Sequence, residues 1–174
     1  GAFRAVSQIV SYEIPQILAL FVPVMLSGSL SLQEIIKAQT VPYAIALPLP
    51  ALIYFLASMA ELGRLPFELA EADSEIVAGY FTEYSGMMFG SFYLAEFINN
   101  FTASVMFSVL FLGGWRGPWV NAVPMLGPVW LLLKAFIVFN VLMLFWAAMP
   151  RLRIDQVLAF NWKFMVPWGL VVLM

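Results

Sequence analysis

Long apolar runs dominate the chain, and five of them have about the length that a membrane helix needs. They cover about residues 5–30, 41–62, 84–112, 124–149 and the stretch from 160 onward. A helix crosses the hydrocarbon core of a bilayer with roughly 20 mostly apolar residues. The pattern therefore predicts an all-α fold, a polytopic transmembrane bundle with about five spans. We find no internal repeat or linker, so residues 1–174 are expected to form a single transmembrane domain.

Prolines punctuate the second run. Pro42, Pro48 and Pro50 lie near its start. Proline removes a backbone N–H and clashes with the preceding turn, although neighbouring helices in a membrane can satisfy the freed carbonyl groups. We expect this helix to be kinked or broken near its beginning.

The cations are distributed unequally between the two ends of the predicted spans. Five alternating spans put Lys37 and Arg116 on one side and a larger group on the other: Arg4, Arg64, Arg151, Arg153 and Lys163. An excess of Lys and Arg marks the cytoplasmic side or its organellar equivalent. The segment 63–83 is then an acidic loop on the cytoplasmic side.

Composition supports a membrane protein and excludes several kinds of site. Hydrophobic residues make up 63% of the chain and charged residues 10%, whereas soluble domains carry about 25% charged residues. There are no cysteines and no histidines, and iron–sulfur clusters, b-type haem and most zinc sites need those ligands. We therefore expect no metal and no redox centre in this chain. A net charge of −2 gives no indication of nucleic-acid binding.

Six of the ten acidic residues lie in or next to the loop between the second and third runs. Glu61 and Arg64 stand at its start, and five of the ten acids follow: Glu68, Glu71, Asp73, Glu75 and Glu83. If the loop is helical, Glu68, Glu71 and Glu75 share one face. Crowded carboxylates repel one another, so some should have a raised pKa and could store and pass protons. The alternative is a solvated acidic loop, or acids that favour a helix N-terminus through its dipole.

Three further ionisable groups lie inside predicted spans. At a rise of ~1.5 Å per residue, Glu13 lies about 13 Å past Arg4, Glu96 about 18 Å past Tyr84 and Lys134 about 15 Å past Pro124. Charges at such depth are costly unless they are paired or hydrated, so these side chains should line a polar pathway. The alternative is a buried ion pair that only orients helices, for instance Lys134 with Glu96.

Several motifs resemble one family of membrane proteins. They include Ser11-Tyr12-Glu13-Ile14-Pro15, the run from Arg64-Leu65-Pro66-Phe67-Glu68 to Glu75, Glu83-Tyr84-Ser85-Gly86, Phe92-Tyr93-Leu94-Ala95-Glu96, and Arg151-Leu152-Arg153-Ile154-Asp155-Gln156. Together they resemble the H subunit of proton-pumping NADH–quinone oxidoreductase (respiratory complex I), whose mitochondrial counterpart is NADH dehydrogenase subunit 1. The chain is similar to the C-terminal part of that subunit. It departs from the family at Glu68, Ala70, Asp73 and Leu62-Gly63, where the family usually has Asp, Pro, Glu and Thr-Asn.

The resemblance implies a role in coupling quinone reduction to proton translocation. It places Arg64, Glu71, Asp73 and Glu75 at the quinone chamber and its loop. It assigns a proton relay to Glu13, Glu61, Glu68, Glu71, Asp73, Glu75, Glu83 and Glu96, to which we add Lys134. Quinone would be a substrate shared with partner subunits, and neither metal nor flavin would be bound by this chain.

The resemblance also implies where the protein works, and it leaves alternative families open. Such a subunit belongs to a large hetero-oligomeric complex in a bacterial or mitochondrial inner membrane, surrounded by lipid, and would have no activity alone. The nearest rival is the related membrane subunit of energy-converting hydrogenases and formate hydrogenlyases. A stand-alone secondary transporter would show inverted repeats, which we do not find, and a passive scaffold would not need Glu13 and Glu96.

Overall fold

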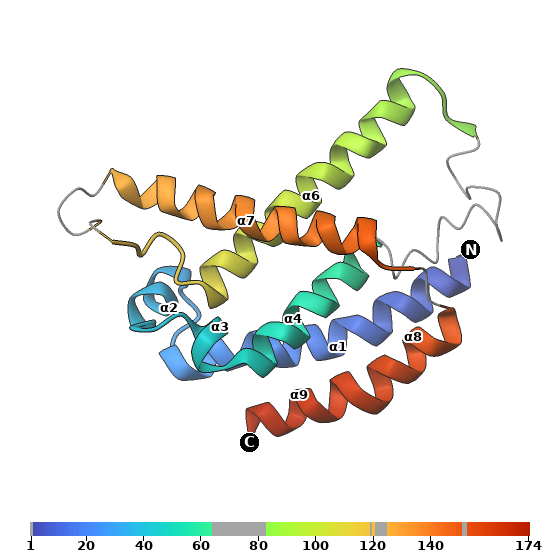
Figure 1. The fold of residues 1–174 in the computed structure, drawn as a ribbon. Helices are drawn as coiled ribbons and strands as arrows, with labels where there is room; N and C mark the ends of the chain where they lie inside the picture. The colour runs from blue at the N-terminus through green and yellow to red at the C-terminus, as the bar shows by residue number, and fades with distance from the viewer. Residues whose placement is uncertain (1, 64–82, 119, 121–124, 151–152) are drawn as a thin grey trace.

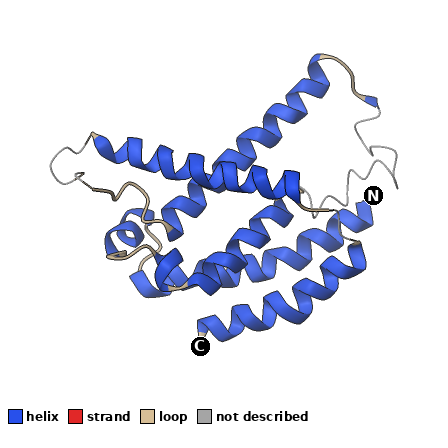
Figure 2. Cartoon of the chain, viewed as in Figure 1, coloured by secondary structure: helices blue, strands red, loops and turns tan. Residues whose placement is uncertain are grey.

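The computed structural model describes residues 2–63, 83–118, 120, 125–150 and 153–174, and all its regular elements in these ranges are helical (Figures 1 and 2). The helices in chain order are α1 (Ala2–Ser27), α2 (Leu32–Ala38), α3 (Tyr43–Ala46), α4 (Pro48–Glu61), α6 (Met87–Phe111), α7 (Leu126–Ala148), α8 (Ile154–Phe160), a π-helical segment η2 (Asn161–Met165) and α9 (Val166–Leu173).

Four helical stretches in the described residues are long and apolar enough to cross a membrane. They are Val10–Ser27 within α1, Met87–Phe111, Leu126–Ala148 and the continuous stretch Asp155–Leu173. A shorter apolar helix, Pro48–Glu61, corresponds to the second predicted run. The predicted all-α membrane fold is confirmed, with four long helices and one short one.

One boundary differs from the sequence prediction, and one helix was not predicted. Helix α8 begins at Ile154 rather than near residue 160. The sequence prediction placed the start too late because the polar residues Asp155 and Gln156 form the first turn and interrupt the apolar run. Helix α2 was assigned to a connection, since seven residues with a glutamate and a lysine do not resemble a span. The predicted break occurs at Leu47, whose extended backbone separates α3 from α4, and Pro48 opens α4.

The helices run alternately between two ends of the bundle (Figure 1). The N-terminus, the start of α8 and the end of α7 lie at one end, while α2 and the segment after α6 lie at the other. Helix α1 packs along α4 and α9, and α7 crosses the C-terminal half of α6. Arg116 Nη1 donates hydrogen bonds to the carbonyl oxygens of Lys37 and Gln39. Lys37 and Arg116, predicted to share a side, are therefore neighbours.

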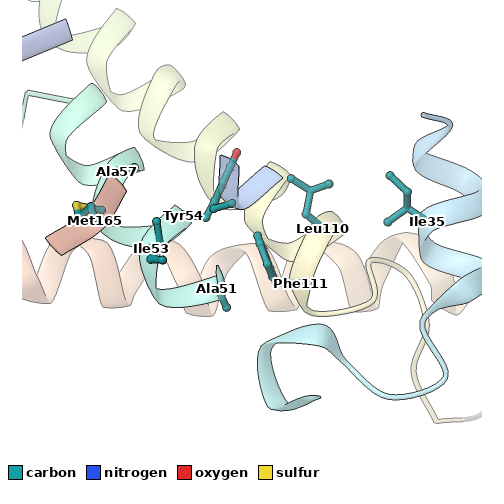
Figure 3. Close-up of a cluster of buried hydrophobic side chains, with 9 residues drawn as sticks. Ile35, Ala51, Ile53, Tyr54, Ala57, Leu110, Phe111 and Met165 are labelled. Carbon is teal, nitrogen blue, oxygen red and sulfur yellow. The ribbon is translucent and has the colours of Figure 1, made fainter. Parts of the chain in front are cut away.

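The core lies where α1, α2, α4, α6 and η2 meet (Figure 3). Ile35, Ala57 and Phe111 are at most 1% exposed, and they pack with Ile53, Tyr54, Leu110 and Met165. The rings of Tyr54 and Phe111 have centroids 5.4 Å apart. A second cluster joins α1, α4, α7 and α8 through Tyr12, Met59, Ala60, Val138, Leu142 and Val157. The N-terminal half of α6 lies outside both clusters, and most of its large apolar side chains are exposed.

Candidate functional site

The carboxylate of Glu61 is held at the contact between α1 and α4. Glu61 is the last residue of α4, and Gln16 Nε2 of α1 donates a 2.6 Å hydrogen bond to its Oε2. Glu13 lies three residues before Gln16, about one turn earlier on α1, and is exposed on the bundle surface. Two of the predicted relay acids therefore lie near the same helix–helix contact.

Two buried tyrosines line this contact. Tyr12 of α1 is 6% exposed and lies close enough to Glu13 and Glu61 to feel both charges. Tyr54 of α4 is 4% exposed, and its hydroxyl lies beside Gln16. The result is a polar group of hydroxyls, an amide and carboxylates where membrane helices normally pack apolar side chains. Hydroxyl groups both donate and accept hydrogen bonds, so they can pass protons between acids.

The other described acids of the predicted relay lie on or before α6. Glu96 is partly buried on α6, nine residues after its start and so about 13 Å along the helix axis. Glu83 is exposed just before α6. The half of α6 that carries Glu96 projects away from α1 and α4 (Figure 1). The structure thus brings Glu13 and Glu61 together but does not bring Glu96 next to them.

Lys134 holds the segment that follows α6. Its Nζ donates hydrogen bonds to the carbonyl oxygens of Leu112, Gly114 and Arg116, at 2.7, 3.1 and 2.6 Å. Sixteen residues of helix and turn separate Glu96 from Leu112, about 24 Å at the helical rise. The alternative of a Lys134–Glu96 ion pair is therefore wrong. The lysine sits near the opposite end of α6, where it satisfies carbonyl groups that the helix end leaves free.

The remaining predicted site residues fall outside the described residues. They are Arg64, Glu68, Glu71, Asp73 and Glu75, so their relay and quinone-chamber roles stay predictions. Within the described ranges, no group of three or more His, Cys, Asp or Glu side chains could hold a metal ion. A wholly apolar cavity of about 310 Å³ lies between α4, α6 and α7, lined by Phe55, Phe107 and Val138 among others.

Sequence reasoning missed the polar neutral residues of the site. Gln16 and Tyr54 gave no signal in an apolar run, although Gln16 lies three residues from Glu13 on the same helix face, which could have marked it. Asn100 of α6 is only 2% exposed and lies one turn after Glu96. A buried amide one turn from an intramembrane acid is a pattern that the sequence displayed.

Comparisons with known proteins point to one family along the whole chain. The family described as NADH dehydrogenase matches residues 1–174. The chain is 50% identical over 170 residues to the H subunit of NADH-quinone oxidoreductase from Dehalococcoides mccartyi, and the match covers 98% of the chain and 47% of that relative. For the same subunit from Chlorobaculum tepidum the identity is 44%, with 98% and 53% covered. For the one from Geobacillus thermodenitrificans it is 43%, with 98% and 52% covered.

These relatives are therefore about twice as long as the chain, which spans about half of their length. The match extends through the acidic loop and both helices that carry the intramembrane glutamates. The chain belongs to the NADH dehydrogenase family as a multi-pass membrane homologue of the H subunit of NADH-quinone oxidoreductase.

Proposed function

We propose that the chain is part of the membrane subunit of a proton-translocating NADH–quinone oxidoreductase. In this role it walls part of the quinone chamber and carries a carboxylate relay that couples quinone reduction to proton movement. Its activity depends on membrane and hydrophilic partner subunits in an energy-transducing membrane. The names of the relatives support the enzyme, and the contact between Gln16 and Glu61 is the observation that supports the relay.

The Gln16–Glu61 contact supports a relay because of its geometry and its surroundings. Glu61 is exposed at the end of an apolar helix, and Gln16 of the neighbouring helix holds its carboxylate in place. Tyr12 and Tyr54 extend the polar group into the buried interface. Groups that trade protons must lie within hydrogen-bond reach or one water apart. Glu61 therefore links the acidic loop that follows it to α1 and Glu13.

The loop acids complete the proposal. Glu68, Glu71, Asp73, Glu75 and Glu83 would receive the change of charge when the quinone headgroup is reduced, with Arg64 tuning their charge. Glu61 and Glu13 would pass the change between α4 and α1, and Glu96 would pass it along α6. The fold does not place Glu96 next to Glu61. The relay between these two acids therefore runs through the loop or through partner subunits.

The relatives favour the quinone enzyme over the hydrogenase subunit as the setting. The proteins from Dehalococcoides, Chlorobaculum and Geobacillus are all named as subunits of NADH-quinone oxidoreductase. Identification of the neighbouring subunits in the purified complex separates the two. A nickel–iron subunit next to this chain would refute the quinone assignment while leaving the relay open.

The relay is tested in the assembled complex by replacing acids with their amides. We expect Glu13→Gln, Glu61→Gln and Glu96→Gln each to lower the number of protons moved per electron, because an amide cannot carry a titrating proton. Glu34→Gln is the matched control, since Glu34 is an exposed acid of α2 at the far end of the bundle. Quinone reduction and proton uptake are measured together in sealed vesicles. Normal quinone reduction and a normal number of protons per electron in all three variants would refute the relay.

A further inference from the structure

A line of polar side chains runs along α6 beyond Glu96. Glu96, Asn100, Ser104 and Ser108 are spaced four residues apart and so lie on one ridge of the helix. Asn100 is 2% exposed, and Ser104 and Ser108 are fully buried. Other parts of α6 expose large apolar side chains such as Leu94 and Ile98. Asn100, Ser104 and Ser108 therefore lie on the side of α6 that is covered by protein, whereas Ser91 and Thr102 are exposed.

The side-chain amide of Asn100 lacks good partners. Its Oδ1 is buried and has no hydrogen-bond partner among the described residues. Its Nδ2 lies 4.0 Å from the sulfur of Met143 on α7, which is a weak acceptor. Burying an amide without hydrogen bonds costs roughly 1–3 kcal/mol in proteins, and ordered water normally removes that cost. Asn100 Oδ1 therefore needs a hydrogen-bond donor that the described residues do not supply.

The two serines can continue a line of water. Ser104 Oγ donates to the carbonyl oxygen of Asn100 at 2.8 Å, and Ser108 Oγ donates to that of Ser104 at 2.9 Å. Each hydroxyl oxygen keeps its capacity to accept a hydrogen bond. From Glu96 to Ser108 the ridge extends about 18 Å along the axis, more than half of a ~30 Å hydrocarbon core.

The line ends beside a polar pocket. The backbone N–H of Gly114 donates to the carbonyl oxygen of Ser108 at 2.9 Å, and Lys134 Nζ donates to that of Gly114. Lys134 also lines a pocket of about 340 Å³ together with Gln39, Thr40 and Arg116. Gln39 is 2% exposed, and its Oε1 has no hydrogen-bond partner in the described part of the chain. This pocket is a second place where a buried oxygen needs a donor such as water.

We propose that this ridge of α6 carries a file of ordered water that conducts protons between Glu96 and the polar pocket at Lys134. The proposal rests on the proposed relay, because Glu96 must be a titrating member of it. A proton leaving the Glu96 carboxyl is passed from oxygen to oxygen as O–H bonds and hydrogen bonds exchange, and one proton is released to water in the pocket. No electron and no further reactant take part.

A purely structural reading competes with this one. Small residues such as serine allow membrane helices to approach closely, and hydroxyls that bond to their own helix are common. That reading explains Ser104 and Ser108 without water. It does not explain why an asparagine with an unpartnered oxygen is buried against α7 in line with them.

The test replaces the polar groups of the ridge in the full-length subunit of the assembled complex. Asn100→Leu, Ser104→Ala and Ser108→Ala together keep the shape of the face but remove the groups that hold water. The matched control is Ser91→Ala with Thr102→Val, because both residues make the same bond to the carbonyl four residues earlier but are exposed on the same helix. Protons moved per electron are measured in sealed vesicles, along with quinone reduction.

We expect the ridge variant to move protons through this route about tenfold more slowly or worse, the change that an added barrier of about 1.4 kcal/mol gives. The ratio of protons to electrons then falls in the ridge variant and not in the control. An unchanged ratio would overturn the water file. If it is unchanged while Glu96→Gln lowers it, the relay stands and only this inference fails.

A second measurement tests the proposal without the ridge variant, in case that variant does not assemble. A map of the unmodified complex, at a resolution that shows ordered water elsewhere in the membrane arm, should show water at Asn100 Oδ1 and between Ser104 and the pocket. A dry, closely packed contact between α6 and α7 at these positions would also overturn the proposal.

Discussion

Loss of the Lys134 ammonium should loosen the segment after α6 without disrupting the rest of the fold. In Lys134→Met an apolar side chain of similar length replaces the donor of three hydrogen bonds to the carbonyl oxygens of Leu112, Gly114 and Arg116. Hydrogen bonds between polar side chains in membrane proteins are worth on average about 0.6 and at most about 1.7 kcal/mol each. Three of them stabilise the segment by about 2–5 kcal/mol.

Global stability is a poor readout of this change. A cation in a membrane helix costs about 2.5–3.5 kcal/mol on insertion scales, so its removal offsets part of the lost hydrogen bonding. Local opening is a better measure, because the amides of Gly114 and Arg116 are protected only while the turn is formed. They donate to the carbonyl oxygens of Ser108 and Gly113, both at 2.9 Å.

The assay is hydrogen exchange of this segment in the purified complex. A loss of about 2 kcal/mol raises the population of the open segment, and with it the exchange rate, about 30-fold. Asn140→Leu is the control, because Asn140 is an exposed residue of the same helix whose side chain donates to the carbonyl oxygen of Phe136 on that helix. A rise of less than about threefold, equivalent to ~0.7 kcal/mol, would refute the anchoring role of Lys134.

Three substitutions test the packing around the site, each measured as the free energy of unfolding in mixed detergent. Gly114→Ala should destabilise by about 2–4 kcal/mol, because Gly114 has φ +50° and a Cβ would lie 2.7 Å from Ile36 Cδ1; a neutral effect would show that α2 does not pack here. Gly90→Ala on α6 meets nothing within 4 Å, so it should stabilise by about 0.5–1 kcal/mol, and a loss would contradict the exposed position. Phe111→Ala should cost about 3–5 kcal/mol, because Phe111 is fully buried; a cost below ~1 kcal/mol would contradict the core shown in Figure 3.

The sequence was sufficient for the fold class, because apolar length is the main determinant of a membrane helix. The proline-rich start of the second run broke where expected, at Leu47 between α3 and α4. Helix α2 could not be predicted in the same way, since its formation depends on packing. Ile36 is fully buried against the turn at Gly114, a contact between positions 78 residues apart in the chain.

The candidate site was predictable in its charges but not in its neutral partners. Glu13 and Glu96 stand out because a charge in an apolar run needs a reason to be there, whereas Glu61 was a candidate only through the resemblance to the family. The side chain that holds Glu61 is Gln16, 45 residues away, and only the packing of α1 on α4 brings them together. Lys134 was placed correctly inside a span, but the carbonyl groups that it contacts belong to a turn whose path depends on the positive φ of Gly113 and Gly114.

The measurement that tests the relay most directly is infrared difference spectroscopy of the assembled complex as quinone is reduced. If Glu61 and Glu96 each gain or lose a proton in the relay, a carboxyl band should change on reduction and shift in heavy water. The band should disappear from the difference spectrum in Glu61→Gln or Glu96→Gln, while Glu34→Gln leaves it intact. A difference spectrum that is the same in the unmodified complex and in both variants would contradict the relay.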